Sequence, residues 1–189
     1  MRSVIIVLFL FLLAGCGTSP LTYAERTLND LYPILSPIEE YRLESLSDSA
    51  AVDLFVEQFW MRADTVEESG CSISRTEYNE RVAYANTHFP DRWGRSDRKR
   101  IYLLYGPPSS VERREANNFA VGSAVPAKSL EVWLYMTGGK HNGLPAVMDD
   151  IHPGEMKFIF GDRNGAGDFR LIYSSEDSQD TDARLYRRP

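Results

Sequence analysis

RWGRSDRKRIYLLYGPP, residues 92–108, divides the chain into a helical half and a half built of strands. The charged beginning of this stretch runs into the apolar and aromatic segment Ile101–Tyr105, which stops at Gly106-Pro107-Pro108. Because proline cannot continue a central strand, this end is sharp and rigid. We therefore predict that residues 101–105 form the first strand of a sheet, with helices before it and further strands after it.

The helical half begins with two short segments. Residues 21–31 place apolar side chains at helical spacing, and Pro33 stops this segment. Ser36 and Glu39 have the spacing of a capping box, in which each side chain bonds the backbone N–H of the other. The pattern predicts a second helix from this box to about Leu46.

The next segment carries the clearest apolar face of the chain. It opens at Ser47-Asp48 and gives way at Asp64 to a polar loop that ends at Ile73. Apolar residues at i, i+3, i+4, i+7 and i+8 lie on one side of a helix. We predict that this face is core and packs on the sheet. Its members are Val52, Phe55, Val56, Phe59 and Trp60.

A further helix is predicted between Ser74 and Pro90. Ser74 and Glu77 form a second capping-box pattern. A narrower apolar stripe follows at helical spacing, and Pro90 ends the segment. The stripe consists of Tyr78, Val82, Ala85 and Phe89.

The second half predicts strands at 130–136, 156–160 and 169–173, two of them with alternating aromatic residues. Residues 161–168 form a tight hairpin connection, and the polar segment 174–189 is a tail. With residues 101–105 this gives about four strands. The predicted fold class is α+β, with N-terminal helices packed on a small, mainly antiparallel sheet.

The N-terminus is typical of a bacterial lipoprotein. A positive n-region and a short apolar run lead to Leu13-Ala14-Gly15-Cys16, which is a lipobox pattern. We predict a signal peptide over 1–15, a lipid on Cys16, a tether over 16–20 and a single domain over 21–173. Because Gly17 rather than Asp follows the cysteine, the resemblance to sorting in enteric bacteria implies the periplasmic face of the outer membrane of a Gram-negative bacterium.

Charge and cysteine content exclude some other classes. The formal net charge is −6, so the chain lacks the basic footprint of nucleic-acid binding. With Cys16 consumed by lipid, Cys71 has no partner for an intramolecular disulfide. The histidines show no base pattern beside Cys71, so we assign no catalytic residue, metal or cofactor.

Several blocks of residues stand in a recognisable order: 59–60 with Arg62 and Asp64, 81–86 with Phe89, 97–98, 100–102, 105–108, 131–133 and 162–171. In this order they resemble the GWxTD-domain family of bacterial lipoproteins and secreted proteins. The name-giving motif reads Trp93-Gly94-Arg95-Ser96-Asp97 here, with Gly and Trp exchanged, and the Pro-rich segment usual after Arg62 and Asp64 is replaced by 64–68. The family has no established activity, so the resemblance implies no catalytic residues.

A weaker layout analogy links the chain to BamE-type outer-membrane assembly lipoproteins. Those proteins also follow a Gly-Pro turn with a Trp-x-Tyr strand and a late aromatic strand. The corresponding residues here are Gly106-Pro107, Trp133 to Tyr135, and 158–160.

Two sets of residues are candidates for a site. Charged and polar residues at both ends of the helical half can form a structural clamp that fixes the start of the first strand, or a binding surface. They are Arg62, Asp64, Arg81, Asn86, Asp97 and Arg100, and Trp133 with Tyr135 adds an aromatic surface. The loop 162–168 has some oxygen ligands of a calcium loop, but its Asn-Gly and Gly-Asp pairs favour a turn.

Two functions remain open. The first is a non-enzymatic interaction or assembly module that binds another envelope protein through the sheet edge or the Trp-Tyr surface. The alternative is an envelope enzyme, a peptide or glycan hydrolase, which needs titratable groups that converge in a cleft. We favour the first.

Overall fold

A computed structural model describes residues 21–65, 73–90, 96–115, 127–136 and 155–176. The predictions for the signal peptide, for Cys16, for Cys71 and for Trp93 lie outside these residues. Among the described residues, no helix is both long and apolar enough to cross a membrane. Helices precede strands along the chain. The elements are α1 (Tyr23–Leu31), α2 (Pro37–Glu44), α3 (Ser49–Thr65), α4 (Arg75–His88), α5 (Asp97–Tyr105), β1 (Ser110–Glu115), β2 (Ser129–Met136), β3 (Glu155–Asp162) and β4 (Phe169–Ser174).

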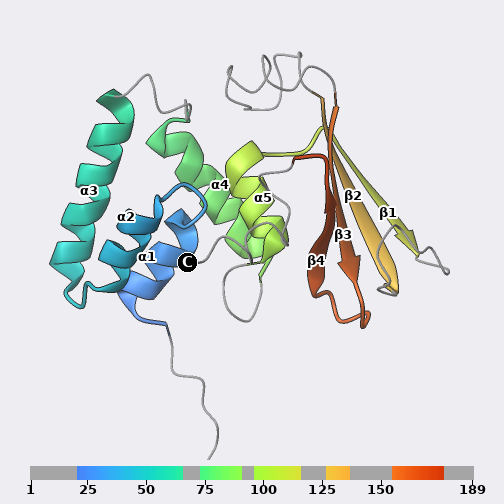
Figure 1. Cartoon of the computed structure of the whole chain (residues 1–189), viewed down its shortest axis with the longest axis horizontal. Helices are drawn as coiled ribbons and strands as arrows, with labels where there is room; N and C mark the ends of the chain where they lie inside the picture. The colour runs from blue at the N-terminus through green and yellow to red at the C-terminus, as the bar shows by residue number, and fades with distance from the viewer. Residues whose placement is uncertain (1–20, 66–72, 91–95, 116–126, 137–154, 177–189) are drawn as a thin grey trace, which may run out of the picture.

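The predicted fold class is confirmed. The helices form one body beside a sheet of strand order β1-β2-β3-β4, in which all neighbours are antiparallel. In Figure 1 the helices lie on the β4 side of the sheet, and β1 lies at the far edge from them.

The helix starts follow the capping residues. Ser36 and Glu39 close the predicted capping box at α2. At α4, Ser74 Oγ accepts from Glu77 N at 3.2 Å, whereas the Glu77 carboxylate accepts from Arg81 Nη2 at 2.7 Å. The serine half of the second predicted box is therefore confirmed, and its glutamate has a different partner.

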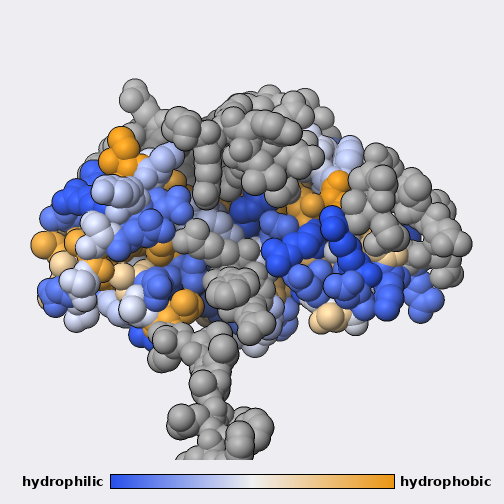
Figure 2. Space-filling model, turned by 60° about the horizontal axis from the view of Figure 1, so that its bottom comes forward, coloured by the Kyte–Doolittle hydropathy of each residue, from blue (hydrophilic) through white to orange (hydrophobic). Residues whose placement is uncertain are grey.

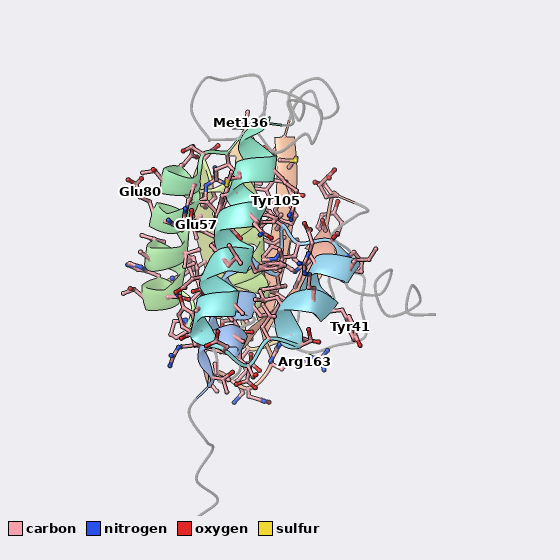
Figure 3. The ribbon with its side chains drawn as sticks, turned by 90° about the vertical axis from the view of Figure 1, so that its left-hand side faces the viewer. Tyr41, Glu57, Glu80, Tyr105, Met136 and Arg163 are labelled. Atoms are coloured by element: carbon pink, nitrogen blue, oxygen red, sulfur yellow. The ribbon has the colours of Figure 1, made fainter. Side chains whose placement is uncertain are left out.

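The prediction of a strand over residues 101–105 is wrong, because these residues form the second half of α5. Ser96 caps the helix by accepting from Lys99 N at 3.0 Å, and Gly106 ends it with a φ of +74°. That left-handed φ is open to glycine at no steric cost. A short apolar run is compatible with either a buried strand or a buried helix, and packing decides here for the helix. Tyr105 lies inside the molecule, in contrast to the exposed Tyr41 on α2 (Figure 3).

The fourth strand is instead β1, which the sequence did not predict. Its six residues, SVERRE, are all exposed, so it has no apolar alternation to reveal it. The strand is defined by its pairing with β2, in which Val111 lies opposite Trp133 and Arg113 lies opposite Glu131.

The apolar face of α3 is buried, but it packs on helices. Val52, Phe55, Phe59 and Trp60 are core residues, and Val56 is partly buried against them. The Trp60 ring lies 5.6 Å from the ring of Tyr78 on α4. The prediction that this face packs on the sheet is wrong, since α4 and α5 lie between α3 and the strands (Figure 1). The helix also extends beyond Asp64, to Thr65.

The core between α5 and the sheet is aromatic. Tyr105 lies 5.2 Å from Phe158, and Trp133 lies 4.9 Å from Phe160, measured between ring centroids. The rings of Trp133, Phe158 and Phe160 come from the helix-facing sides of β2 and β3, and that of Tyr105 comes from α5. Burial of such rings holds α5 against the sheet.

Candidate functional site

The predicted charged residues of the helices lie in separate contacts. Arg62 Nη2 on α3 pairs with Glu39 Oε1 on α2 at 2.7 Å, near the surface. The Asp64 side chain lies outside the described residues.

Arg81 is only 4% exposed, and its Nη1 donates to the carbonyls of Leu103 and Leu104 at 3.2 and 3.1 Å. These carbonyls belong to the last turn of α5, where a cation meets unsatisfied acceptors and the negative end of the helix dipole. Arg81 therefore ties α4 to the C-terminus of α5.

Asn86 belongs to a buried lysine contact that the sequence analysis missed. Lys99 is 3% exposed, and its Nζ donates to Asp30 Oδ1 and to Asn86 Oδ1, both at 2.7 Å. Asn86 Nδ2 also donates to Asp30 Oδ1 at 3.2 Å. The contact joins α1, α4 and α5. Lys99 lies among several arginines at the charged beginning of the 92–108 stretch. Nothing in the sequence shows that this basic residue is buried rather than solvated.

Asp97 joins α5 to the edge of the sheet. Its Oδ2 accepts from Leu171 N in β4 at 2.8 Å, and its Oδ1 lies 3.8 Å from Arg100 Nη2 one turn along α5. The clamp hypothesis expected Asp97 at the start of a strand formed by residues 101–105, paired with a charged residue of the preceding helices. The described partners of Asp97 are Leu171 N of β4 and Arg100 of its own helix instead.

A buried glutamate is the centre of the junction between α5 and the sheet. Glu131 on β2 is 1% exposed, and it accepts from Trp133 Nε1 at 2.7 Å and from Arg113 Nε at 2.8 Å. Its Oε2 also lies 3.6 Å from Arg98 Nη1 on α5. Glu131 shares the helix-facing side of β2 with Trp133 and Tyr135. A charged residue on this otherwise apolar face is a sequence signal from which its burial could have been predicted.

Arg98 completes this junction from the helix. Its guanidinium carbon lies 4.3 Å from the ring centroid of Phe169 and 5.3 Å from that of Phe89, within the range of cation–π attraction. Its buried Nε has no hydrogen-bond partner. Burial lowers the pKa of Arg98, and the Glu131 carboxylate opposes this shift. The arrangement keeps a buried charge pair between helix and sheet.

Trp133 and Tyr135 face this junction and are 1% and 0% exposed. Tyr135 Oη donates to Gly106 O at 3.0 Å, which fixes the exit from α5. The prediction that the pair forms an exposed aromatic surface is therefore wrong.

The loop between β3 and β4 is built around Asp162. Its carboxylate accepts from the backbone N–H groups of Asn164, Gly165, Ala166 and Gly167 at 3.1, 2.9, 3.3 and 2.7 Å. These bonds agree with the prediction that residues 162–168 form a turn rather than a calcium loop. Burial raises the pKa of Asp162, but the backbone donors outweigh it, so this pKa lies below its ordinary value. In the part of the chain that the structure describes, no group of three or more His, Cys, Asp or Glu residues could hold a metal ion.

Replacing Asp162 by Asn should lower the free energy of unfolding by about 2 kcal/mol near neutral pH, since a charged acceptor of several bonds is lost. A depressed folded-state pKa stabilises the protein above the ordinary value of about 3.9, and this stability is lost as the pH falls below it. Urea unfolding at pH 7 and pH 3 should therefore show a difference between wild type and Asp162→Asn that shrinks in acid. Asp168→Asn, in the same loop but exposed, is the control, and a pH-independent difference would contradict this role for Asp162.

Two surface grooves lie in the helical half. One, of about 800 Å³, has an apolar floor that includes Leu28 and Val52, and its rim includes Glu25 and Asp48. The other, of about 600 Å³, lies among α1, α3 and α4 and includes Trp60. None of the predicted site residues lines either groove.

The described geometry defines an α+β protein with a helical body joined to a four-stranded antiparallel sheet through buried charges. Models of protein families, curated proteins and solved structures gave no significant match to this chain.

Proposed function

We propose that this protein is a lipoprotein of the GWxTD type, anchored in the outer membrane through Cys16 and facing the periplasm. It acts as a non-enzymatic interaction or assembly module of the cell envelope. The anchor rests on the agreement of the n-region, the apolar run and the lipobox at the N-terminus. More than one acyl chain makes such anchoring stable, because each buried methylene contributes about 0.8 kcal/mol.

The observation that carries the interaction role is the edge strand β1. All six of its side chains are exposed, and within the described sheet it pairs only with β2. Such an edge presents backbone donors and acceptors to an added strand, which is a common mode of protein recognition. The charged residues Arg81, Asp97 and Glu131 support this role of β1 indirectly. They bind backbone groups or neighbouring side chains within the molecule, so we assign them a structural role.

Photo-cross-linking in intact cells tests this function. A photo-reactive amino acid placed at Glu112 or Arg114 of β1 should give covalent adducts on irradiation, because a bound strand lies within reach of these side chains. The control is the same amino acid at Tyr41 on α2, which is 76% exposed. Adducts should form at the β1 positions and not at the control.

The same cells test the anchor. Metabolic labelling with a fatty-acid analogue should mark the wild type and not Cys16→Ala, and only the wild type should fractionate with the outer membrane. Equal labelling of both proteins would refute the anchor. An absence of adducts at both β1 positions in the labelled, membrane-bound protein would refute the interaction role.

A further inference from the structure

We propose that the strand added to β1 is β1 of a second copy of this chain, so that two sheets join into one continuous sheet. This inference rests on the proposed role of β1 as an interaction edge, and it names the partner. The two strands run antiparallel around a two-fold axis that passes between the two Arg113 residues. The argument follows from the charges and the facing directions of the strand.

The pairing with β2 fixes which way each side chain of β1 faces. Arg113 lies opposite Glu131 and donates to it, so Arg113 faces the helix side of the sheet. Glu112 and Arg114 lie opposite Val132 and Leu130, so they share the outer side. In a continuous antiparallel sheet directly opposed residues share a face. Two copies of β1 can therefore pair only in registers that centre on a residue.

Among the registers centred on residues 112–114, charge favours the one centred on Arg113. There, Glu112 of each copy lies opposite Arg114 of the other, and this favourable pair occurs twice. A register centred on Glu112 would place two glutamates face to face, and one centred on Arg114 would place two arginines face to face. The two Arg113 side chains meet at the axis, but each is paired with its own Glu131 at 2.8 Å. Opposite charges across strands stabilise pairing, and like charges destabilise it.

The described part of the molecule leaves room for this contact. The other edge of the sheet differs, because Leu171 N in β4 donates to Asp97 at the start of α5. The helices lie beside β4, so those of two copies are separated by both sheets (Figure 1). Hydrophilic residues cover much of the sheet half in the face that Figure 2 shows, whereas apolar residues are scattered over the helical half. Charge pairing therefore suits the sheet better than apolar contact does.

Sedimentation equilibrium of the full acylated chain in density-matched detergent micelles measures the association. We expect a reversible dimer. Glu112→Arg and Arg114→Glu should each weaken it, by about tenfold for two altered cross-strand pairs. The double variant restores opposite charges across the interface and should recover most of the affinity. Both side chains are more than half exposed, so we expect the variants to fold, and circular dichroism checks this.

Cysteine cross-linking tests the register. In a Cys71→Ser background, Arg113→Cys should form an intermolecular disulfide on mild oxidation, since opposed Cα atoms lie within disulfide range. Ser110→Cys is the matched control on the same strand, because two such cysteines lie about 20 Å apart in this register.

The outcomes separate the two proposals. A dimer with recovery in the double variant and a disulfide only at position 113 supports self-pairing. A monomer at all concentrations, a dimer without recovery, or equal disulfide formation at position 110 overturns it. If β1 also gives cross-links to a different protein in cells, the partner assignment fails while the interaction role stands.

Discussion

Glu131→Ala should lower the free energy of unfolding by about 3–5 kcal/mol, because it removes one partner of a buried ion pair. Arg98, which is 9% exposed, would lose its carboxylate while its Nε already lacks a hydrogen bond. The indole N–H of Trp133 would lose its acceptor as well. Urea unfolding followed by far-UV circular dichroism measures the loss.

Two further variants show that charge is the cause. Glu131→Gln retains an acceptor for Trp133 but no charge, so its loss should be intermediate. The double variant Arg98→Met with Glu131→Leu removes both charges and should cost less than the sum of the single changes, since apolar pairs can replace buried ion pairs. Glu155→Ala, at the exposed start of β3, is the control. A loss below about 1 kcal/mol in Glu131→Ala would mean that Arg98 finds another partner or reaches water.

Trp60→Ala should lower the free energy of unfolding by about 3–5 kcal/mol, the range for truncating a large buried aromatic residue. Trp60 is 4% exposed, and its ring lies 5.3 Å from Phe59 and 5.6 Å from Tyr78. Its removal would open a cavity between α3 and α4. The thermal midpoint and the urea midpoint should both fall.

Met61→Ala is the matched control for Trp60, because Met61 is the next residue of α3 and its exposed fraction is 67%. It should change stability by less than about 0.5 kcal/mol. Similar losses in the two variants would show that α3 fails as a helix rather than as a packing face. A small loss in both would place the Trp60 ring on an accessible surface.

Local chemistry made several features predictable. The cap at Ser36 and the apolar face of α3 could be predicted because capping and helical periodicity depend on residues within a few positions of one another. The strands β2, β3 and β4 were predicted from short local segments, two of which, β3 and β4, have alternating aromatic residues. The turn at Asp162 could be predicted from its glycines.

The candidate site was predictable in part. Asp97 and Arg81 were singled out as charged residues, and their partners include a strand N–H and two helix carbonyls. Every residue has backbone N–H or C=O groups, so the sequence does not show which of them a charged side chain will bind. Lys99 was missed because a charged side chain is usually solvated, and only a three-dimensional contact shows that this one is buried. Glu131 was missed although it lies on an otherwise apolar face of β2.

By itself, the sequence determined the fold class, the starts of α2 and α4, and three of the strands. The lipoprotein character is a prediction from the same sequence. The tertiary structure alone decided that residues 101–105 are helical, because a short apolar run satisfies either periodicity until its neighbours are in place. It alone made residues 110–115 a strand, since an exposed edge owes its conformation to the ladder with β2. It also decided which charges are buried, because the free energy of a charge depends on the solvent and the partners that folding gives it.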